Sequence, residues 1–330
     1  MSESHDYVPA PQWQGHDFQR ARARYDQHVS SSYQEAVTSG ASLDSKREKK
    51  VSSKAQRPLI IVIDETSSMG DWPATMFSKL PYLDHEVRDY LGDDAEICFA
   101  AIGDAHKNET YALQVRPFAT GKDLEVRLKQ LTIENKGGGN GGETYELAAL
   151  YFAHNLSVSA MAEPIVIFIG DEPCFDSVSV EHAAKYACVK LDRSLTTKQV
   201  FAELQRTASV YFIQKPYGSS DAGSGNSWNG ETKRAHDKWV PLVGESHIAM
   251  LPDPNRVVDV IFGILAAEVD RIDDFREEIE GRQKPGQVKT VYKSLETIHA
   301  VTAGSRKALR SGNSVMLKDL GDGDASTPLA

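Results

Sequence analysis

Three short segments of the chain place oxygen-bearing side chains where apolar or glycine-rich runs end. The apolar run LIIVID is followed by ETSSMG, the glycine-rich run GGNGG by ETYELAAL, and the apolar run IVIFIG by DEP. Their carboxylate and hydroxyl oxygens are the kind of ligands that suit a hard divalent cation such as Mg²⁺ or Mn²⁺.

The elements that would position these side chains alternate between strands and helices. Continuous apolar runs predict strands buried on both faces, and amphipathic stretches between them predict helices. This alternation predicts an α/β fold: a doubly wound, mostly parallel six-stranded sheet with helices on both faces. The predicted strands are 59–64, 95–103, 111–118 at an edge, 164–170, 209–214 and 247–251. The predicted helices are 73–91, 121–131, 143–158, 177–190, 196–207 and 254–279.

The predicted sheet brings the oxygen-bearing residues to one place. Ligands of open α/β sheets bind beyond the carboxyl ends of the strands, where the strand order reverses. The strands that end at Asp64 and Asp171 would be neighbours there. The first segment alone is a weak signal, because Ser68 or Asp71 could simply cap a strand-to-helix turn. Three such segments in order favour the metal site.

The two ends of the chain differ in composition from its middle. We expect an N-terminal amphipathic helix and a basic, Ser/Lys-rich linker over residues 1–57, and the main domain over 58–280. A C-terminal helix and a disordered tail are expected over 281–330. A Gly/Ser-rich loop, 217–230, should follow the fifth strand.

Charge and composition favour a cytoplasmic protein without nucleic-acid partners. The net charge is 37 − 47 = −10, which repels a phosphate backbone. The start of the chain has no apolar core typical of a secretory signal. The longest apolar stretch, 257–269, is too short to span a bilayer. Cys98, Cys174 and Cys188 are odd in number and unpaired in spacing, as expected in a reducing compartment.

Over residues 58–275 the chain resembles von Willebrand factor A-type (vWA) domains. The segment DETSSMG is similar to the D-x-S/T-x-S motif, usually followed by Met-Gly, that opens their metal-ion-dependent adhesion site (MIDAS). Thr66 stands where Ser is commoner, which keeps the hydroxyl. Thr144 and Asp171 match the second and third elements of that site. The resemblance therefore implies two carboxylates and three hydroxyls as metal ligands: Asp64, Thr66, Ser68, Thr144 and Asp171. The resemblance implies strand order 3-2-1-4-5-6 and a metal whose open position accepts a carboxylate from a partner protein.

This resemblance implies a protein-interaction module that is not an enzyme. Intracellular bacterial vWA proteins of this kind often act beside an AAA+ ATPase of the MoxR type, as adaptors or substrate selectors. The predicted partner is therefore a protein that offers a carboxylate to the metal, with a MoxR-type ATPase as a candidate. The helices expected in 16–37 and 288–310 would pack on the domain or dock a partner helix.

Two other functions stay open from the sequence. A metal-dependent hydrolase would use the cation as a Lewis acid, with Glu143 or Glu172 as general base. We expect these two glutamates, and Glu65, to be surface acids. A Ro-like RNA-binding vWA protein would need residues 46–57 to offset the negative net charge.

Other kinds of site have weak support. The run 137–142, GGGNGG, lacks the Gly-Lys-Ser/Thr of a phosphate loop. Cys174, His182 and Cys188 are poorly spaced for zinc. His106 is expected at a hairpin tip.

Overall fold

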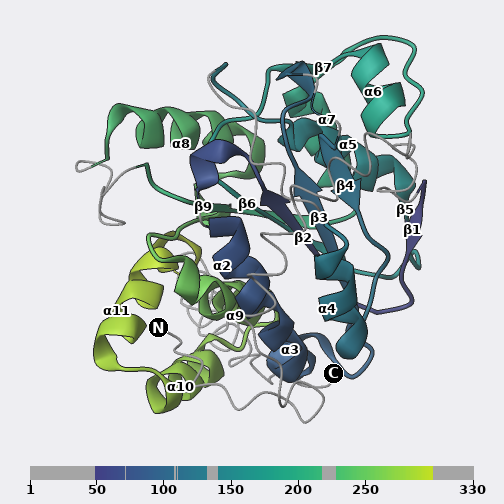
Figure 1. Cartoon of the computed structure of the whole chain (residues 1–330). Helices are drawn as coiled ribbons and strands as arrows, with labels where there is room; N and C mark the ends of the chain where they lie inside the picture. The colour runs from purple at the N-terminus through teal and green to yellow at the C-terminus, as the bar shows by residue number, and fades with distance from the viewer. Residues whose placement is uncertain are drawn as a thin grey trace, which may run out of the picture.

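The computed structural model describes residues 49–299, apart from 71, 108, 110, 132–139 and 218–227. A six-stranded sheet lies at its centre, with helices on both sides (Figure 1). The strands are β1 (Val51–Ser52), β2 (Leu59–Asp64), β3 (Ile97–Ile102), β4 (Leu113–Val115), β5 (Leu156–Ser157), β6 (Ile165–Gly170), β7 (Ser177–Val178), β8 (Leu195–Thr196), β9 (Ser209–Gln214) and β10 (Ile248–Met250). The α-helices are α2 (Trp72–Lys79), α3 (Leu83–Leu91), α4 (Lys122–Lys129), α5 (Tyr145–Asn155), α6 (Val180–Tyr186), α7 (Thr197–Leu204), α8 (Gly230–Val243), α9 (Val257–Glu268), α10 (Ile272–Arg282) and α11 (Pro285–Ser294). Short 3-10 helices are η3 (Ser67–Met69), η4 (Leu80–Tyr82), η5 (Ala105–Lys107), η6 (Glu245–His247) and η7 (Pro254–Arg256).

The strand order of the large sheet is β10-β9-β6-β2-β3-β4. Every neighbouring pair is parallel except β3 and β4, which are antiparallel. Numbered along the chain, the six strands follow the order 3-2-1-4-5-6. The prediction of an α/β fold with a mostly parallel six-stranded sheet is therefore confirmed, with β4 as its antiparallel edge strand.

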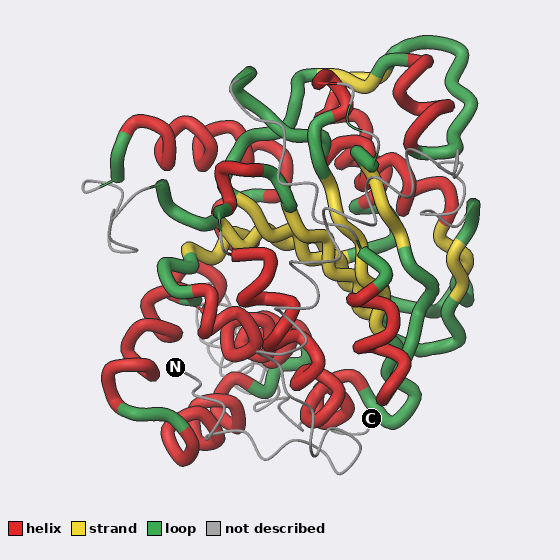
Figure 2. The backbone as a smooth tube through the Cα atoms, in the orientation of Figure 1, coloured by secondary structure: helices red, strands yellow, loops and turns green. Residues whose placement is uncertain are grey.

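Helices cover both faces of this sheet because its central strands are apolar on both sides. In β2, Leu59, Ile61 and Ile63 pack into one core, while Ile60 and Val62 pack into the other. The first core lies under α2, α3, α4, α9, α10 and α11, and the second lies under α5, α6, α7 and α8. Figure 2 shows the strands as a central band between these two helical layers.

Three helical expectations need correction. The single helix expected over 73–91 is interrupted by the 3-10 turn η4 between α2 and α3. The single closing helix expected over 254–279 is broken, because the chain turns at Asp270 with a positive φ of 58° between α9 and α10. Helix α8 was not predicted, since its sequence is polar on average and contains Pro241. Its buried residues follow helical spacing, so a signal was present: Thr232, Ala235, His236, Trp239 and Val243.

The segments that flank the predicted domain pack against it. Val51 and Ala55 are buried, and β1 pairs with β5, so residues 51–57 are not a linker. At the other end, Val288 and Val291 of α11 join the first core. The predicted N-terminal helix and C-terminal tail lie outside the described residues. No helix in the described part of the chain is long and apolar enough to cross a membrane.

Candidate metal centre

The predicted metal ligands Asp64 and Asp171 lie at the carboxyl ends of two adjacent strands. Asp64 is the last residue of β2, and Asp171 directly follows β6. The two strands are parallel, with Ile63 opposite Ile169, so both chains end at the same edge of the sheet. From β2 the chain continues on one side to β3, while β6 lies on the other side. This is the switch point at which open α/β sheets bind their ligands.

Two hydroxyls lie between these aspartates, and each donates its proton to one of them. The Thr66 hydroxyl donates to Oδ1 of Asp64 at 2.6 Å and lies 3.2 Å from the hydroxyl oxygen of Ser68. Ser68 in turn donates to Oδ1 of Asp171 at 2.9 Å. We call Asp64, Thr66, Ser68 and Asp171 the aspartate cluster. Both aspartates are fully buried.

The local backbone explains how three alternate residues reach one point. Thr66 is extended and accepts a hydrogen bond from Met69, which starts the short helix η3. The turn ends at Gly70, whose φ of 56° and ψ of −126° are a conformation that only glycine adopts readily. The Met-Gly pair that follows the aspartate motif is thus a structural requirement of this turn.

Thr144, the fifth predicted ligand, lies beside the aspartate cluster but is not hydrogen-bonded to it. It stands immediately before α5, and its hydroxyl donates to the carbonyl oxygen of Gly103 at 2.6 Å. This bond uses the hydroxyl proton and leaves oxygen lone pairs available.

Tyr145, the next residue, ties α5 to the aspartate cluster. Its hydroxyl donates to Oδ2 of Asp64 at 2.6 Å. The contact depends on Gly170, because a Cβ there would lie 1.7 Å from the Tyr145 hydroxyl oxygen. We did not predict this residue, although it is the immediate neighbour of a predicted ligand.

Three glutamates that we expected at the surface are buried beside the site. Glu65, Glu143 and Glu172 are 5%, 0% and 8% exposed. Glu172 accepts hydrogen bonds from Tyr217 and, at 2.9 Å, from Arg234. Neither carboxylate oxygen of Glu143 has a hydrogen-bond partner among the described residues.

The electrostatics of the site disfavour the negative charge that it holds. Burial, together with the nearby Asp171 carboxylate, raises the pKa of Asp64 to about 7. Burial raises the pKa of Glu143 to about 11, with further contributions from Asp64 and other nearby carboxylates. A cation would relieve both effects, because it offsets the repulsion between these buried acids.

One cationic side chain already contacts the aspartate cluster. The ammonium group of Lys215, the residue after β9, lies 2.7 Å from Oδ2 of Asp171 and donates to the carbonyl oxygen of Ser68 at 2.8 Å. Because β9 is the neighbour of β6, this lysine reaches the same sheet edge. A lysine directly after a predicted strand was the available sequence signal, and we did not use it.

The donor set fits a hard divalent cation. Its atoms are carboxylate and hydroxyl oxygens, and the unpartnered, buried Glu143 shows that the surroundings hold uncompensated polar groups. Within the described residues, no three His, Cys, Asp or Glu side chains converge as metal ligands. The set predicted here is of another kind, since it has two carboxylates and three hydroxyls.

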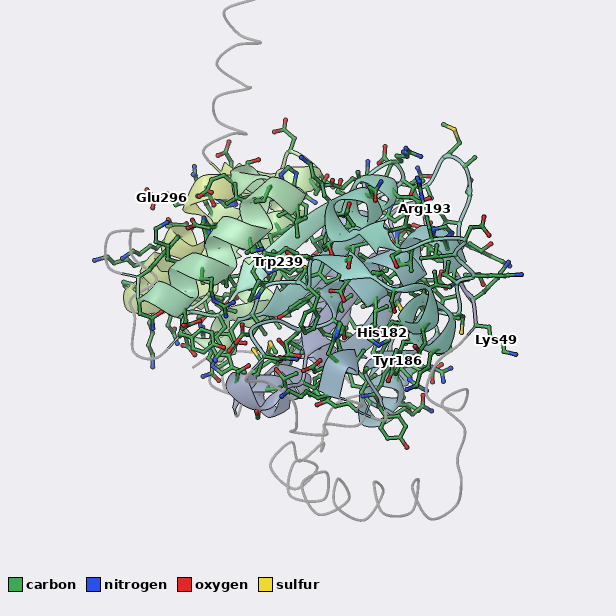
Figure 3. The ribbon with its side chains drawn as sticks, turned by 90° about the horizontal axis from the view of Figure 1, so that it is seen from above. Lys49, His182, Tyr186, Arg193, Trp239 and Glu296 are labelled. Carbon is green, nitrogen blue, oxygen red and sulfur yellow. The ribbon has the colours of Figure 1, made fainter. Side chains whose placement is uncertain are left out.

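A small aromatic and histidine group lies near the glycine-rich segment. The ring of His106 lies 4.0 Å from that of Phe175 and 4.8 Å from that of His182, centroid to centroid. His182 also packs edge-on against Tyr186, and both are marked in Figure 3. His106 was expected at a hairpin tip. It lies in the 3-10 turn η5, and its ring packs against the aromatic rings of Phe175 and His182.

Comparisons with known proteins give little support for any one family. No family model matches the chain, and no curated protein is similar to it in sequence. Similar solved structures include the pilus adhesin SpaC from Lactobacillus rhamnosus GG in an open conformation, at 8% identity and a TM-score of 0.46, covering 70% of this chain and 31% of that chain. Another is proximal thread matrix protein 1 from the mussel byssus, at 10% identity and a TM-score of 0.41, covering 68% and 49%. This chain thus spans about a third to a half of the length of these proteins.

Proposed function

We propose that this chain is a vWA-type domain that binds a divalent cation, Mg²⁺ or Mn²⁺, and through it an acidic residue of a partner protein. The observation that supports this most directly is the aspartate cluster. Its two carboxylates and two hydroxyls meet at the ends of two adjacent strands, at the switch point of the sheet. The residues proposed to hold the cation are Asp64, Thr66, Ser68, Thr144 and Asp171.

The chain's own residues would orient and shield the cation. The backbone N–H and hydroxyl of Thr66 and the hydroxyl of Tyr145 fix the Asp64 carboxylate by three hydrogen bonds. Such bonds to a ligating carboxylate hold its orientation and commonly change metal affinity by about 10-fold to 100-fold. A bound Mg²⁺ supplies an electrophilic centre with a position open to an outside oxygen ligand.

The charge around the site favours an anionic ligand once a cation is present. The carboxylates of Asp171 and Glu172 pair with Lys215 and Arg234, so these four side chains balance. Asp64 adds a carboxylate whose ionised form is disfavoured by burial and by Asp171. With Asp64 ionised, these five side chains carry −3 + 2 = −1 without metal and +1 with a divalent cation, and a carboxylate from a partner would restore neutrality.

Hydrolysis is the weaker proposal, because its two candidate bases are poorly placed to act. Glu172 is held by Arg234 and Tyr217, and Glu143 is buried with a raised pKa. A general base must be ionised and within reach of a substrate proton. We therefore propose a non-enzymatic, cytoplasmic interaction module, with a MoxR-type AAA+ ATPase as the candidate partner. The RNA-binding alternative would need residues 46–57 to supply the contact, and of these Val51 and Ala55 are buried.

The first test is metal binding by the purified protein. Titration with Mn²⁺ in a calorimeter should show one site, and saturation at about 100 times Kd should raise the unfolding free energy by about 2.7 kcal/mol. Asp64→Ala should lose both effects while keeping its circular dichroism spectrum. Asp176→Ala is the matched control, since this carboxylate is 87% exposed and pairs with Lys238. An absence of Mn²⁺ binding by the wild type would refute the proposal.

The second test concerns the partner. Proteins recovered from a native lysate with the wild type and Mg²⁺ would be compared with those recovered with EDTA or with Asp64→Ala. We expect a partner that appears only in the first sample. The same partners in all three samples would show that the cation is not the recognition element.

A further inference from the structure

Lys215 is held at the aspartate cluster by two directed hydrogen bonds. Its ammonium group donates to Oδ2 of Asp171 and to the backbone carbonyl of Ser68. Its own backbone N–H donates to Gly170 at 2.8 Å, which fixes the start of the side chain beside the end of β6. The side chain is only 13% exposed. This lysine is therefore a fixed part of the site.

The two oxygens of Asp171 are both engaged in this arrangement. Oδ1 accepts the Ser68 hydroxyl, and Oδ2 accepts the Lys215 ammonium group. An ammonium group is a compact positive charge, as a metal ion is, and it uses the same carboxylate lone pairs. A divalent cation that draws on Asp171 must therefore weaken or replace the contact with Lys215.

We propose that Lys215 is a resident counter-ion that competes with the divalent cation for Asp171 and so sets the metal affinity of the site. This inference rests on the proposed metal binding. It adds that the site holds its own cation when no metal is bound, and that metal binding exchanges one cation for another.

The surroundings of Lys215 provide a second position for the displaced ammonium group. The ring centroids of Trp72 and Tyr217 lie 5.8 Å and 5.4 Å from its nitrogen. Both rings are within the range of cation–π attraction, so a small rotation of the flexible side chain keeps the charge stabilised. The exchange needs no movement of the strands.

The test measures Mn²⁺ affinity in variants that each remove one positive charge. Lys215→Met should bind Mn²⁺ about tenfold more tightly than the wild type, since a charged hydrogen bond no longer competes. Arg234→Met is the matched control: it removes a nearby charge that pairs with Glu172 and does not touch Asp171. It should change the affinity much less. Thermal melts establish that each variant is folded.

A second readout follows the lysine itself in the wild-type protein. Lys215 can be acetylated with a small amine-reactive acetylating reagent, and the rate can be measured by mass spectrometry. This rate should rise when Mg²⁺ is added. In Asp64→Ala the rate should not respond to Mg²⁺. Because the reagent reports the release of the amine, this measurement separates competition from a through-space effect of charge.

The outcomes distinguish this inference from the proposed function. Equal or weaker Mn²⁺ binding by Lys215→Met, with normal binding by the wild type, would overturn the inference and leave the metal site standing. Equal tightening by Lys215→Met and Arg234→Met, without a change in acetylation, would also overturn it. Failure of both proteins to bind Mn²⁺ would instead refute the proposed function.

Discussion

Among the described residues, two groups of buried charges differ in how well their charges are balanced. Near the start of α9 and the end of α10, Arg256 and Arg282 face Asp259 and Glu86. We call these four residues the arginine cluster. Its formal charges sum to zero, and Gln283 adds a hydrogen bond to Arg256 at 2.7 Å. The four charges pair inside the chain, although burial raises the pKa of Asp259 to about 6.

The surroundings of the aspartate cluster carry more acids than bases. Asp171 and Glu172 pair with Lys215 and Arg234, whereas Asp64 and Glu143 form no salt bridge among the described residues. Burial penalises the unpaired charges, as the raised pKa values of Asp64 and Glu143 show. A fold keeps such groups at a cost in stability, and this is typical of functional sites. Burial of charged side chains alone therefore does not identify a functional site, whereas buried acids without enough counter-charges point to one.

The same kind of substitution, aspartate to asparagine, tests whether the arginine cluster and the aspartate cluster differ in their contribution to stability. Asp259→Asn should destabilise the protein by about 3–5 kcal/mol, because it leaves Arg256 buried without its counter-charge. Asp64→Asn, measured in EDTA, should cost less than about 1 kcal/mol, since it removes a charge that burial and Asp171 already disfavour. Urea unfolding at pH 8 measures both.

An exposed acid provides the baseline for this experiment. Asp273 is 74% exposed and lies 3.7 Å from Arg276, so Asp273→Ala should change stability by about 0.5 kcal/mol or less. If Asp64→Asn in EDTA cost as much as Asp259→Asn, the two groups would be equivalent. The distinction drawn between them would then be wrong.

The sequence predicts the strand ends of this site better than its surroundings. Asp64 and Asp171 could be placed because apolar runs mark buried strands, and parallel strands end at one edge. Lys215 directly follows a predicted strand, but its contact with Ser68 could not be predicted from that position alone. The contact joins residues 147 positions apart and depends on the order of β6 and β9. The burial of Glu143 likewise depends on tertiary packing, since a glutamate after glycines is usually exposed.

The pH dependence of the unfolding free energy tests whether the acids near the aspartate cluster lack compensation, through Glu143. Its pKa rises from 4.5 to about 11 on folding, so the folded protein holds a proton that the unfolded chain releases. Its contribution to stability is fully present below pH 4.5 and is lost as the pH rises toward 11. In EDTA, the wild type should lose up to about 1.4 kcal/mol per pH unit in this window through Glu143 alone. Glu143→Gln should remove this slope.

The measurement is urea unfolding at pH 6, 7 and 8 with EDTA. Glu143→Gln should become progressively more stable relative to the wild type as the pH rises. Glu278→Gln is a suitable control, because this carboxylate accepts from Tyr90 away from the aspartate cluster. Parallel pH profiles for the wild type and Glu143→Gln would contradict the assignment of a protonated Glu143.

The last prediction concerns the hydrogen bond from Tyr145, and it tests how Asp64 is held. Tyr145→Phe keeps the ring packed against Trp239 and removes one hydrogen bond to Asp64, at a cost of about 1 kcal/mol. Tyr211→Phe is matched to it, because that hydroxyl donates to Glu268 at 2.9 Å outside the site. The two variants should lose similar stability in EDTA. Only Tyr145→Phe should weaken Mn²⁺ binding, by about tenfold, because the carboxylate loses a bond that favours its ionised form and fixes its orientation. Equal Mn²⁺ affinities for the two variants would show that Asp64 does not depend on α5 for its position, and that the hydrogen bond from Tyr145 serves the fold alone.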